Sequence, residues 1–415
     1  TLDTWWYAGG LVGYARNSKI FNSFALANDG FFGVGMFGGL VGYLDNSVID
    51  SPIDIPNTQG EITGYDQNIG GLVGYSYNSR IISVINNATV NLFNNKNDDV
   101  YPHSPSNGKL QNIGGIVGTQ NGGEIIATVN MADIFVMSQN SPNEEGINYG
   151  IRENLGGLVG RVMDGQLLAS YNLGSIRHDE GPKVVSTTFF SGYNVGVSNL
   201  DNLGGIVGLM EGGEVKSTYT AGRHVVGVSS RDNSLDALDN SGTLVGNMTG
   251  GVFSASYSLG LLQLNTGFKP SGSVAAPIMS NHTQLIGVNS GGNFTANRFD
   301  EPDNALANCQ VDSRSVELDG GQGGGNVQSC TFNGTQWGDT DAIINPSPES
   351  LTFYDSNYWG DSTFVDADDN TLIINYGWIF DAVGELPVLF ARGPRDEELI
   401  VNATQQRSIL SPLSP

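Results

Sequence analysis

Residues 156–171 read GGLVGRVMDGQLLASY, and two closely similar phrases stand at 114–129 (GGIVGTQNGGEIIATV) and 204–219 (GGIVGLMEGGEVKSTY). Aligned on the opening pentapeptide, copies start at 9, 38, 70, 114, 156 and 204, and degenerate copies start at 242 (GTLVG) and 283 (TQLIG). We number these eight copies repeats 1 to 8. Their starts are 29, 32, 44, 42, 48, 38 and 41 residues apart, which excludes arrays of fixed period such as ankyrin repeats or propellers.

Each repeat carries a second landmark, an apolar residue that is followed three positions later by Ser, Thr or Asn in most repeats. It lies 11 positions after the start, or 10 positions in repeat 2. The landmark residues are Ile20, Val48, Ile81, Ile125, Leu167, Val215, Phe253 and Phe294. A constant interval indicates backbones that must stack in register. The variable remainder is typical of loops that leave the stack, where doubling the length costs only about 0.6 kcal/mol.

The constant part has the composition of short strands. Column three of the pentapeptide is always Leu or Ile, and column four is Val in seven repeats. Dipeptides such as Asn17-Ser18 or a Gly pair separate the two landmarks and accept the positive φ of a tight corner. After the corner, the two-residue period of a strand predicts that Ile20 and Phe24 share the core face, as do Leu167 with Tyr171, Val215 with Tyr219 and Phe253 with Tyr257.

Repeated strand, glycine corner, strand and variable loop predict an all-β chain, a parallel β-solenoid (β-helix) with about eight stacked coils at about 4.8 Å per coil. Identical positions should then form ladders along the stack. One such ladder would comprise Ser23, Ser51, Thr128, Ser170, Thr218, Ser256 and Asn297, interrupted by Val84.

The charge balance excludes some partners. Eighteen Lys and Arg stand against 42 Asp and Glu, a net charge of −24, which disfavours nucleic acid and anionic membrane surfaces. No apolar run approaches the roughly 18 to 20 residues of a membrane-spanning helix, so membrane insertion is not expected. Such a surface suits divalent cations, a basic partner or solubility in salt. The chain begins at Thr1 rather than Met, which predicts a processed piece of a longer precursor.

Two cysteines, Cys309 and Cys330, flank a Gly- and Ser-rich stretch. We predict that they form a disulfide, which would stabilise the fold by about 3 kcal/mol and favours an oxidising compartment. A metal pair or a catalytic thiol would need His or further Cys at ligand spacing, and the sequence places none nearby.

An acidic cluster gives the one candidate metal site. Asp366, Asp368 and Asn370 are spaced like the start of a calcium loop, but Thr371 stands where an EF-hand needs Gly. This cluster either binds calcium or forms a solvated acidic turn. The four histidines have no paired-ligand spacing, and no nucleophile-elbow motif occurs, so the sequence predicts no catalytic residues and no other cofactor.

The phrase GGLVG, a short Gly or Asn-Ser turn and then I-x-x-S-Y-x-x-G resembles the GLUG repeat of large bacterial surface proteins, including adhesins and the non-catalytic part of some immunoglobulin A1 proteases. The resemblance covers residues 8–300, and repeats 5 to 7 match it best. NYWGD at 357–361 and YGWIFDAVGELPVLF at 376–390 resemble the aromatic segment that closes such arrays. The family implies an extracellular or cell-surface architecture and implies no reaction.

These observations divide the chain into a solenoid at 1–300, a Gly- and Ser-rich segment at 301–350 and an aromatic cap at 351–415. Segments 93–112, 138–154, 177–202 and 222–240 should leave the stack on one side and offer contacts to a carbohydrate or host-surface ligand. Little sequence covers the first repeat, which points to truncation, head-to-tail self-association or a cap made by the aromatic cluster at 5–7.

We therefore expect a secreted structural or adhesive protein without catalysis, which presents loops on a rigid rod or assembles into surface fibres. A polysaccharide-degrading enzyme on a β-helix is the alternative, and it would require carboxylates that converge in one cleft. The stalk of a larger surface protease is the third interpretation.

Overall fold

The structure, a computed structural model, is all-β over the residues that it describes, and none of these residues lies in a helix. The described residues are 3–4, 6–33, 35–51, 56–64, 67–93, 110–137, 152–179, 200–220, 223–228, 236–254, 256–258, 261–266, 278–282, 286–295, 298–299, 361–365, 371–375, 378–379 and 388–389. The expectation of an all-β chain with stacked parallel strands is confirmed.

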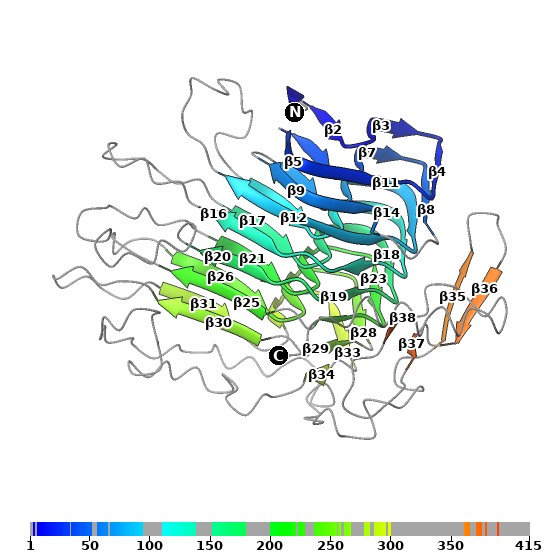
Figure 1. Ribbon diagram of the computed structural model, residues 1–415. Coiled ribbons are helices and arrows are strands. Elements are labelled where there is room, and N and C mark those ends of the chain that lie inside the picture. The colour runs from blue at the N-terminus through cyan, green and yellow to red at the C-terminus, as the bar shows by residue number, and fades with distance from the viewer. Residues whose placement is uncertain are drawn as a thin grey trace, which may run out of the picture.

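Every repeat contributes to three parallel sheets, which we call sheets 1 to 3 (Figure 1). Sheet 1 is formed by the strands that lead into the pentapeptide: β2 (Tyr7–Gly9), β6 (Met36–Gly38), β10 (Gln67–Gly70), β13 (Leu110–Gly114), β17 (Arg152–Gly156), β21 (Leu200–Gly204), β26 (Asp236–Gly242) and β31 (Ile278–His282). Neighbours in this sheet belong to successive repeats, so the repeats stack in sequence order.

Sheet 2 begins at column four of the pentapeptide. Its main strands are β3 (Val12–Arg16), β7 (Val41–Asp45), β11 (Val73–Ile82), β14 (Val117–Ile126), β18 (Val159–Leu168), β22 (Val207–Met210), β27 (Val245–Met248) and β32 (Ile286–Asn289). Five short strands continue it beyond the Asn-Ser or Gly corner: β4 (Lys19–Phe21), β8 (Val48–Asp50), β23 (Glu214–Lys216), β28 (Val252–Ser254) and β33 (Asn293–Thr295).

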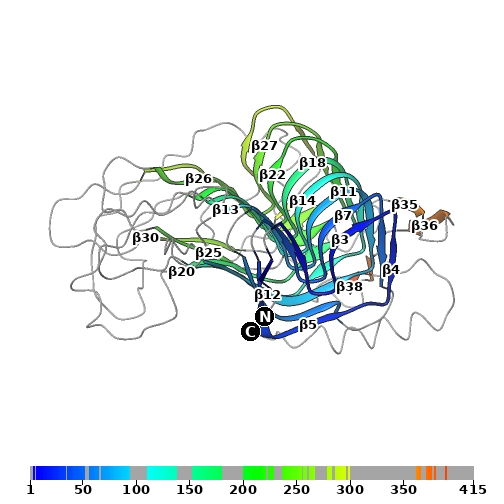
Figure 2. The ribbon, with the colours of Figure 1, turned by 90° about the horizontal axis from the view of Figure 1, so that it is seen from above.

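Sheet 3 follows the second landmark. Its strands are β1 (Asp3–Thr4), β5 (Ala25–Gly33), β9 (Thr58–Gly64), β12 (Ile85–Phe93), β15 (Val129–Asn130), β16 (Ile134–Met137), β19 (Tyr171–Asn172), β20 (Ile176–Asp179), β24 (Tyr219–Thr220), β25 (Arg223–Val228), β29 (Tyr257–Ser258), β30 (Leu261–Thr266) and β34 (Arg298–Phe299). Seen from above, sheet 2 forms an arch on one side, and sheets 1 and 3 extend together on the other (Figure 2).

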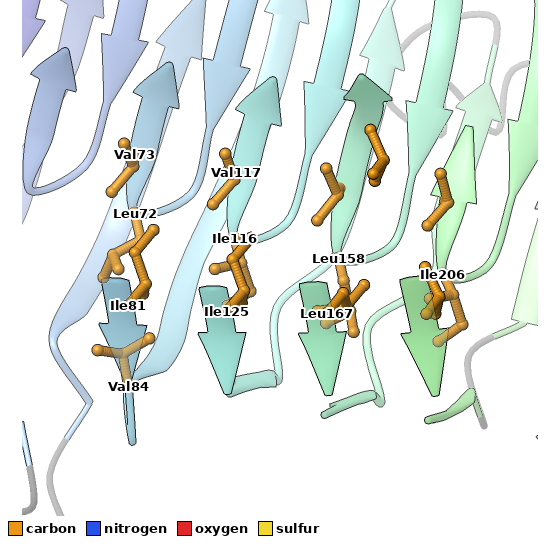
Figure 3. Packing of buried hydrophobic residues seen from close by; sticks show 14 of the residues in the cluster. Leu72, Val73, Ile81, Val84, Ile116, Val117, Ile125, Leu158, Leu167 and Ile206 are labelled. Carbon is orange, nitrogen blue, oxygen red and sulfur yellow. The ribbon is translucent and has the colours of Figure 1, made fainter. Parts of the chain in front are cut away.

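The column-three side chains form one continuous file, as the constant spacing predicts (Figure 3). The amide of Leu72 donates to the carbonyl of Ile116 at 3.0 Å, and the amide of Ile116 donates to the carbonyl of Leu158 at 2.9 Å. Leu158 and Ile206 continue the series at 3.0 Å. All four side chains are fully buried, so both the backbone bonds and the apolar contacts pass from repeat to repeat.

The second landmark also forms a file, with one correction. The structure pairs Ile20 with Ile49 and Ile49 with Ile81, so the landmark of repeat 2 is Ile49 and not Val48. Val48 pairs instead with Lys19 and Arg80. Because 49 − 38 = 11, the interval between the two landmarks is the same in all eight repeats. Parallel stacking in register requires this constancy.

The second glycine of the pentapeptide is needed for close packing. A Cβ atom on Gly115 would lie 2.2 Å from the carbonyl oxygen of Gly157 and 2.3 Å from Nδ2 of Asn130. Both distances are far below van der Waals contact, so a larger residue would push successive repeats apart.

The predicted Asn-Ser and Gly corners are confirmed. Asn17, Asn46 and Asn78 have φ between 44° and 49°, and Gly123 and Gly213 have φ of 74° and 76°. Left-handed backbone is accessible to Gly and tolerated best by Asn among the other residues.

The prediction of two strands per repeat was incomplete, because sheet 1 is a third layer. A further left-handed residue also separates sheets 2 and 3, at Asn22 in repeat 1 and Ala169 in repeat 5. This left-handed residue interrupts the two-residue alternation of a strand, from which the core-face pairs had been predicted. Phe24 is therefore exposed, contrary to the prediction, whereas Tyr171 is buried as expected but lies on a different sheet from Leu167.

Two apolar clusters fill the fold. One lies along sheet 2 and contains the two files described above. The other lies between sheets 1 and 3 and combines Ile113 and Leu155 of sheet 1 with Val90, Ile134 and Ile176 of sheet 3. Each sheet is thus fixed by apolar burial on its inner face.

Described residues after 300 form two small antiparallel sheets. β35 (Asp361–Val365) pairs with β36 (Thr371–Asn375), and β37 (Trp378–Ile379) pairs with β38 (Val388–Leu389). Segment 301–350 lies outside the described residues, so the division into three parts stays a prediction.

We expect Leu158→Ala to lower the free energy of unfolding by about 2–5 kcal/mol, because it leaves a cavity in a fully buried file. Leu11→Ala is the matched control in the same column, where the side chain is 49% exposed, and it should cost less than about 1 kcal/mol. Urea denaturation of both variants gives the comparison. Equal losses would contradict the file as the source of stability.

Candidate functional surfaces

The residues predicted to bind calcium or form a disulfide are not described by the structure. Asp366, Asp368 and Asn370 fall in the gap between β35 and β36, and Cys309 and Cys330 fall within 301–350. Calcium binding and the disulfide therefore stay predictions. Within the described residues, no three or more His, Cys, Asp or Glu side chains gather as a metal site would require.

The variable segments are bounded by strand ends that are aligned. Phe93 pairs with Met137 and Met137 with Asp179, where sheet 3 strands end. Leu110 pairs with Arg152 and Arg152 with Leu200, where sheet 1 strands begin. The described ends of the first three predicted segments are therefore aligned from repeat to repeat, and they belong to sheets 3 and 1. Residues 94–109, 138–151, 180–199 and 229–235 lie outside the described residues.

A file of buried amides runs inside the stack. Nδ2 of Asn86 donates to Oδ1 of Asn130 at 2.8 Å, and Nδ2 of Asn130 donates to Oδ1 of Asn172 at 2.8 Å. The file ends in hydroxyls, since Thr58 donates to Asn86 and Asn172 donates to Thr220 at 3.3 Å. These side chains are at most 1% exposed, so their hydrogen bonds are needed to offset desolvation.

A second amide file runs along the strands of sheet 1. Asn112 donates to Asn68, Asn154 to Asn112, Asn202 to Asn154 and Asn240 to Asn202, with distances between 2.7 and 3.0 Å. All five residues have left-handed φ between 55° and 62°. Each Asn therefore has left-handed backbone within its sheet 1 strand, and its side chain bonds a neighbouring repeat, as amide ladders do in cross-β stacks.

The predicted hydroxyl ladder is present in part. The hydroxyl of Thr128 donates to that of Ser170 at 3.0 Å, and the hydroxyls of Thr218 and Ser256 are 2.9 Å apart. These side chains are buried, so the ladder is a structural contact within the stack. Asn297 lies outside the described residues.

Aromatic side chains gather on the outer face of repeats 1 to 3. The rings of Tyr43 and Tyr75 are stacked with centroids 5.1 Å apart, and Tyr14 lies 5.2 Å from Tyr43. Tyr7 of sheet 1 lies 5.6 Å from Tyr14. Because the ring faces of Tyr43 and Tyr75 meet each other, they stabilise the stack rather than offer a free stacking platform.

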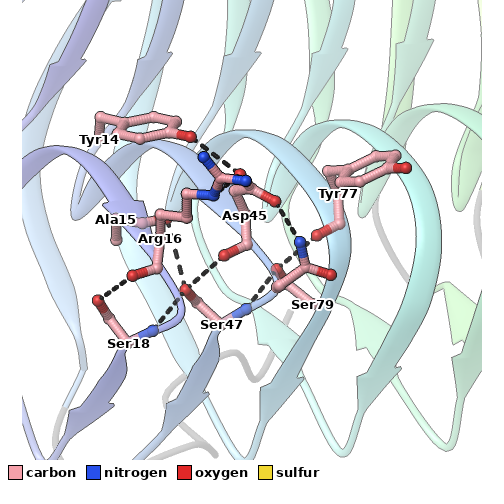
Figure 4. A network of polar contacts seen from close by, with 9 residues as sticks. Tyr14, Ala15, Arg16, Ser18, Asp45, Ser47, Tyr77 and Ser79 are labelled. Carbon is pink, nitrogen blue, oxygen red and sulfur yellow. Dashed lines mark hydrogen bonds and ion pairs between the residues drawn. The ribbon is translucent and has the colours of Figure 1, made fainter.

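The carboxylate of Asp45 binds both the tyrosine cluster and neighbouring polar side chains (Figure 4). Its Oδ2 accepts from the hydroxyl of Tyr14 at 2.9 Å and from Nε of Arg16 at 3.1 Å, and its Oδ1 accepts from Nδ2 of Asn46 at 2.6 Å. Both oxygens of this largely buried carboxylate are thus partnered. Beside it, the hydroxyl of Ser47 accepts from the amide of Ser18 at 2.9 Å.

The hydroxyls of Tyr14 and Tyr43 are held in the protonated form. Burial is the main cause that raises the pKa of Tyr43 to about 12, and the neighbouring Tyr75 and Asp45 add to it. The hydrogen bond to Asp45 is the main cause that raises the pKa of Tyr14. A phenol whose pKa is raised stays protonated at neutral pH, so its hydroxyl remains a hydrogen-bond donor within the cluster.

Repeat 1 carries a large exposed apolar surface. Among the described side chains, seven of the nine exposed large hydrophobic residues belong to residues 6–26: Trp6, Tyr7, Leu11, Tyr14, Phe21, Phe24 and Leu26. Exposed apolar side chains gathered in one repeat are a candidate interaction surface.

Comparisons with protein-family models, with curated proteins and with solved structures find no match for this chain. Among the described residues, no helix has the length and hydropathy needed to cross a membrane.

Sequence reasoning missed both amide files, although the sequence carries them. Asn stands two positions before the pentapeptide in repeats 3 to 7, as in QNIGG at 67–71 and DNLGG at 201–205. The same position is Tyr7 in repeat 1 and Met36 in repeat 2, which pair with each other. An alignment that included the residues just before the pentapeptide would have found this second amide file.

We expect Asn130→Ala to lower the free energy of unfolding by about 2–4 kcal/mol, because it leaves Nδ2 of Asn86 and Oδ1 of Asn172 without this buried partner. Asn121→Ala, which removes only a part-buried bond to the Tyr75 hydroxyl, should cost less than about 1 kcal/mol. Thermal or urea unfolding measures both. A loss at Asn130 no greater than at Asn121 would show that the amide file is dispensable.

Stability should fall at alkaline pH. The contribution linked to the Tyr43 hydroxyl is fully present below the unfolded pKa near 10 and is lost as pH rises through about 12, since the folded pKa is raised. The buried Tyr171 and Tyr219 act in the same direction. Tyr43→Phe should therefore flatten, but not abolish, the decline measured by urea unfolding between pH 9 and about 11.5. An unchanged decline would count against this assignment.

Proposed function

We propose that this chain is an extracellular, GLUG-type surface protein whose repeats wind as a parallel β-solenoid and act as a structural or adhesive rod without catalysis. One observation carries the proposal. Interior polar side chains such as Asn86, Asn130 and Asn172 bond the same position of the next repeat instead of converging on a cleft. Such a design favours stiffness along the stack, which a rod requires.

The rod would present its variable segments as a row. Their flanking strand ends are in register, so successive segments leave the stack about 4.8 Å apart along its axis. Loops on a rigid scaffold are common binding elements. The proposed ligands are a carbohydrate or a host-surface molecule that spans several repeats, and the acidic surface favours a basic or cation-bridged one.

Assembly into fibres is the second form of this proposal. The exposed apolar surface of repeat 1 supports it, because a head-to-tail contact that does not close propagates into a filament.

A loop-replacement experiment tests the rod. Residues 94–109 are exchanged for a Gly-Ser linker of equal length, and binding to immobilised polysaccharides and matrix proteins is compared with the unchanged chain. The circular dichroism spectrum and melting temperature should stay the same, while binding to one ligand class weakens. Hydrolysis of a polysaccharide by the purified chain, abolished by a single carboxylate substitution, would favour the enzyme instead.

A further inference from the structure

Tyrosine occupies the same column of sheet 2 in three successive repeats. Tyr14 pairs in register with Tyr43, and Tyr43 pairs in register with Tyr75. The centroids of the Tyr14 and Tyr43 rings are 5.2 Å apart, and the ring of Tyr7 lies 5.5 Å from that of Tyr43. All four rings are carried by strands, so the fold itself holds the phenols close together.

The rings stand on the outer face of sheet 2, where solvent reaches them from the side. Ala15 and Leu44, which follow Tyr14 and Tyr43 in the chain, are buried on the opposite, inner face. Tyr43 has a repeat on either side and is still only half-buried. Lateral access to the cluster therefore does not depend on what covers either end of the stack.

The cluster contains a proton acceptor as well. The hydroxyl of Tyr14 donates to Oδ2 of Asp45 at 2.9 Å, and Asp45 lies on the strand that carries Tyr43 (Figure 4). This hydrogen bond raises the pKa of Tyr14, so the neutral phenol is the species present. Removing one electron from a neutral phenol makes its hydroxyl strongly acidic. Asp45 is placed to take that proton as the electron leaves, which makes Tyr14 the ring of the cluster that is easiest to oxidise.

Ring orientation selects the pair that would react. Two phenoxyl radicals join at the ring carbons ortho to their oxygens, so two ring edges must meet. The rings of Tyr43 and Tyr75 are parallel within 6° and meet face to face. The ring of Tyr14 is tilted by 36° from that of Tyr43, and rotation about its own side-chain bonds would bring the two edges together. Tyr14 and Tyr43 are therefore the pair best placed to couple.

We propose that Tyr14 and Tyr43 form an oxidative cross-linking site, at which a peroxide-dependent one-electron oxidant produces dityrosine between repeats 1 and 2 while Asp45 accepts the proton of Tyr14. Each phenol loses one electron and its hydroxyl proton. The two radicals then couple through one carbon–carbon bond, and the hydrogens on the bonded carbons move to the phenol oxygens through solvent. One hydrogen peroxide takes up the two electrons and two protons and leaves as two waters. This modification goes beyond the proposed function and does not depend on it.

A second tyrosine stack in the same chain provides an internal control. The rings of Tyr171 and Tyr219 are closer, with centroids 4.8 Å apart and planes 6° apart. Both side chains are only 2% exposed, and burial is the main cause that raises the pKa of each phenol. Proximity alone would make this pair react first, whereas the need for access and for meeting ring edges predicts that it does not react.

The full chain is treated with hydrogen peroxide and a haem peroxidase, and the monomer is then isolated by size exclusion. Dityrosine fluorescence gives the yield, and mass spectrometry after cleavage at Arg16 and Lys19 identifies the linked peptides, because these cuts separate Tyr14 from Tyr43. We expect the link in the monomer, with the loss of two hydrogen atoms. The linked monomer should also unfold at higher urea concentration, since a cross-link restricts the unfolded chain.

Conservative variants locate the site. Tyr14→Phe and Tyr43→Phe should each remove most of the dityrosine, whereas Tyr77→Phe, the same change at a tyrosine that is 37% exposed, should leave the yield unchanged. Asp45→Asn should slow dityrosine formation by about tenfold or more, because an amide does not accept the proton, and Asp45→Glu should restore most of the rate. Circular dichroism verifies that all variants keep their sheet content.

Several results would overturn the proposal. Dityrosine found only in dimers and larger species would place the reaction between molecules, and a link in the monomer that survives Tyr14→Phe would place it elsewhere in the chain. An unchanged rate in Asp45→Asn would remove the proton acceptor, and a link between Tyr171 and Tyr219 formed as fast would show that access does not decide. None of these results bears on the rod, which the loop replacement tests.

Discussion

The fold depends on one hydrogen bond that is repeated from repeat to repeat. The amide at column three of the pentapeptide donates to the carbonyl at column three of the next repeat, from Leu11 through Ile206, at 2.9–3.0 Å. The bond holds aliphatic side chains directly above one another, and glycine at the corner lets the backbones approach that closely. Because the register is fixed there, the amide files, the aromatic stack and the aligned strand ends all follow from it.

Structural features with a constant spacing could be predicted from the sequence, whereas features without a constant spacing could not. The column-three file and the left-handed corners at Asn17, Asn46 and Asn78 follow from an invariant 11-residue interval. Sheet 1 was missed because its strands, such as LQNIG at 110–114, are short, half polar and preceded by segments of unequal length. The position of Phe24 was wrong because the left-handed Asn22 rotates the chain between sheets, which a two-residue period cannot anticipate.

Polar side chains in this protein serve the stack. The two amide files and the Asp45 cluster are bonded between repeats and have their main partners within the fold. Buried polar files of this kind specify register, since a shift by one residue would break every amide–amide hydrogen bond of the file. The candidate functional surfaces are therefore the peripheral ones: the side that carries the variable segments and the exposed apolar residues of repeat 1.

Methyl–methyl nuclear Overhauser contacts in a sample labelled at Leu, Ile and Val test the central claim most directly. In-register stacking predicts contacts between Leu72 and Ile116, between Ile116 and Leu158, and between Leu158 and Ile206, with none that skip a repeat. Contacts between Leu72 and Leu158, or the absence of the sequential series, would contradict the account of both the fold and the rod.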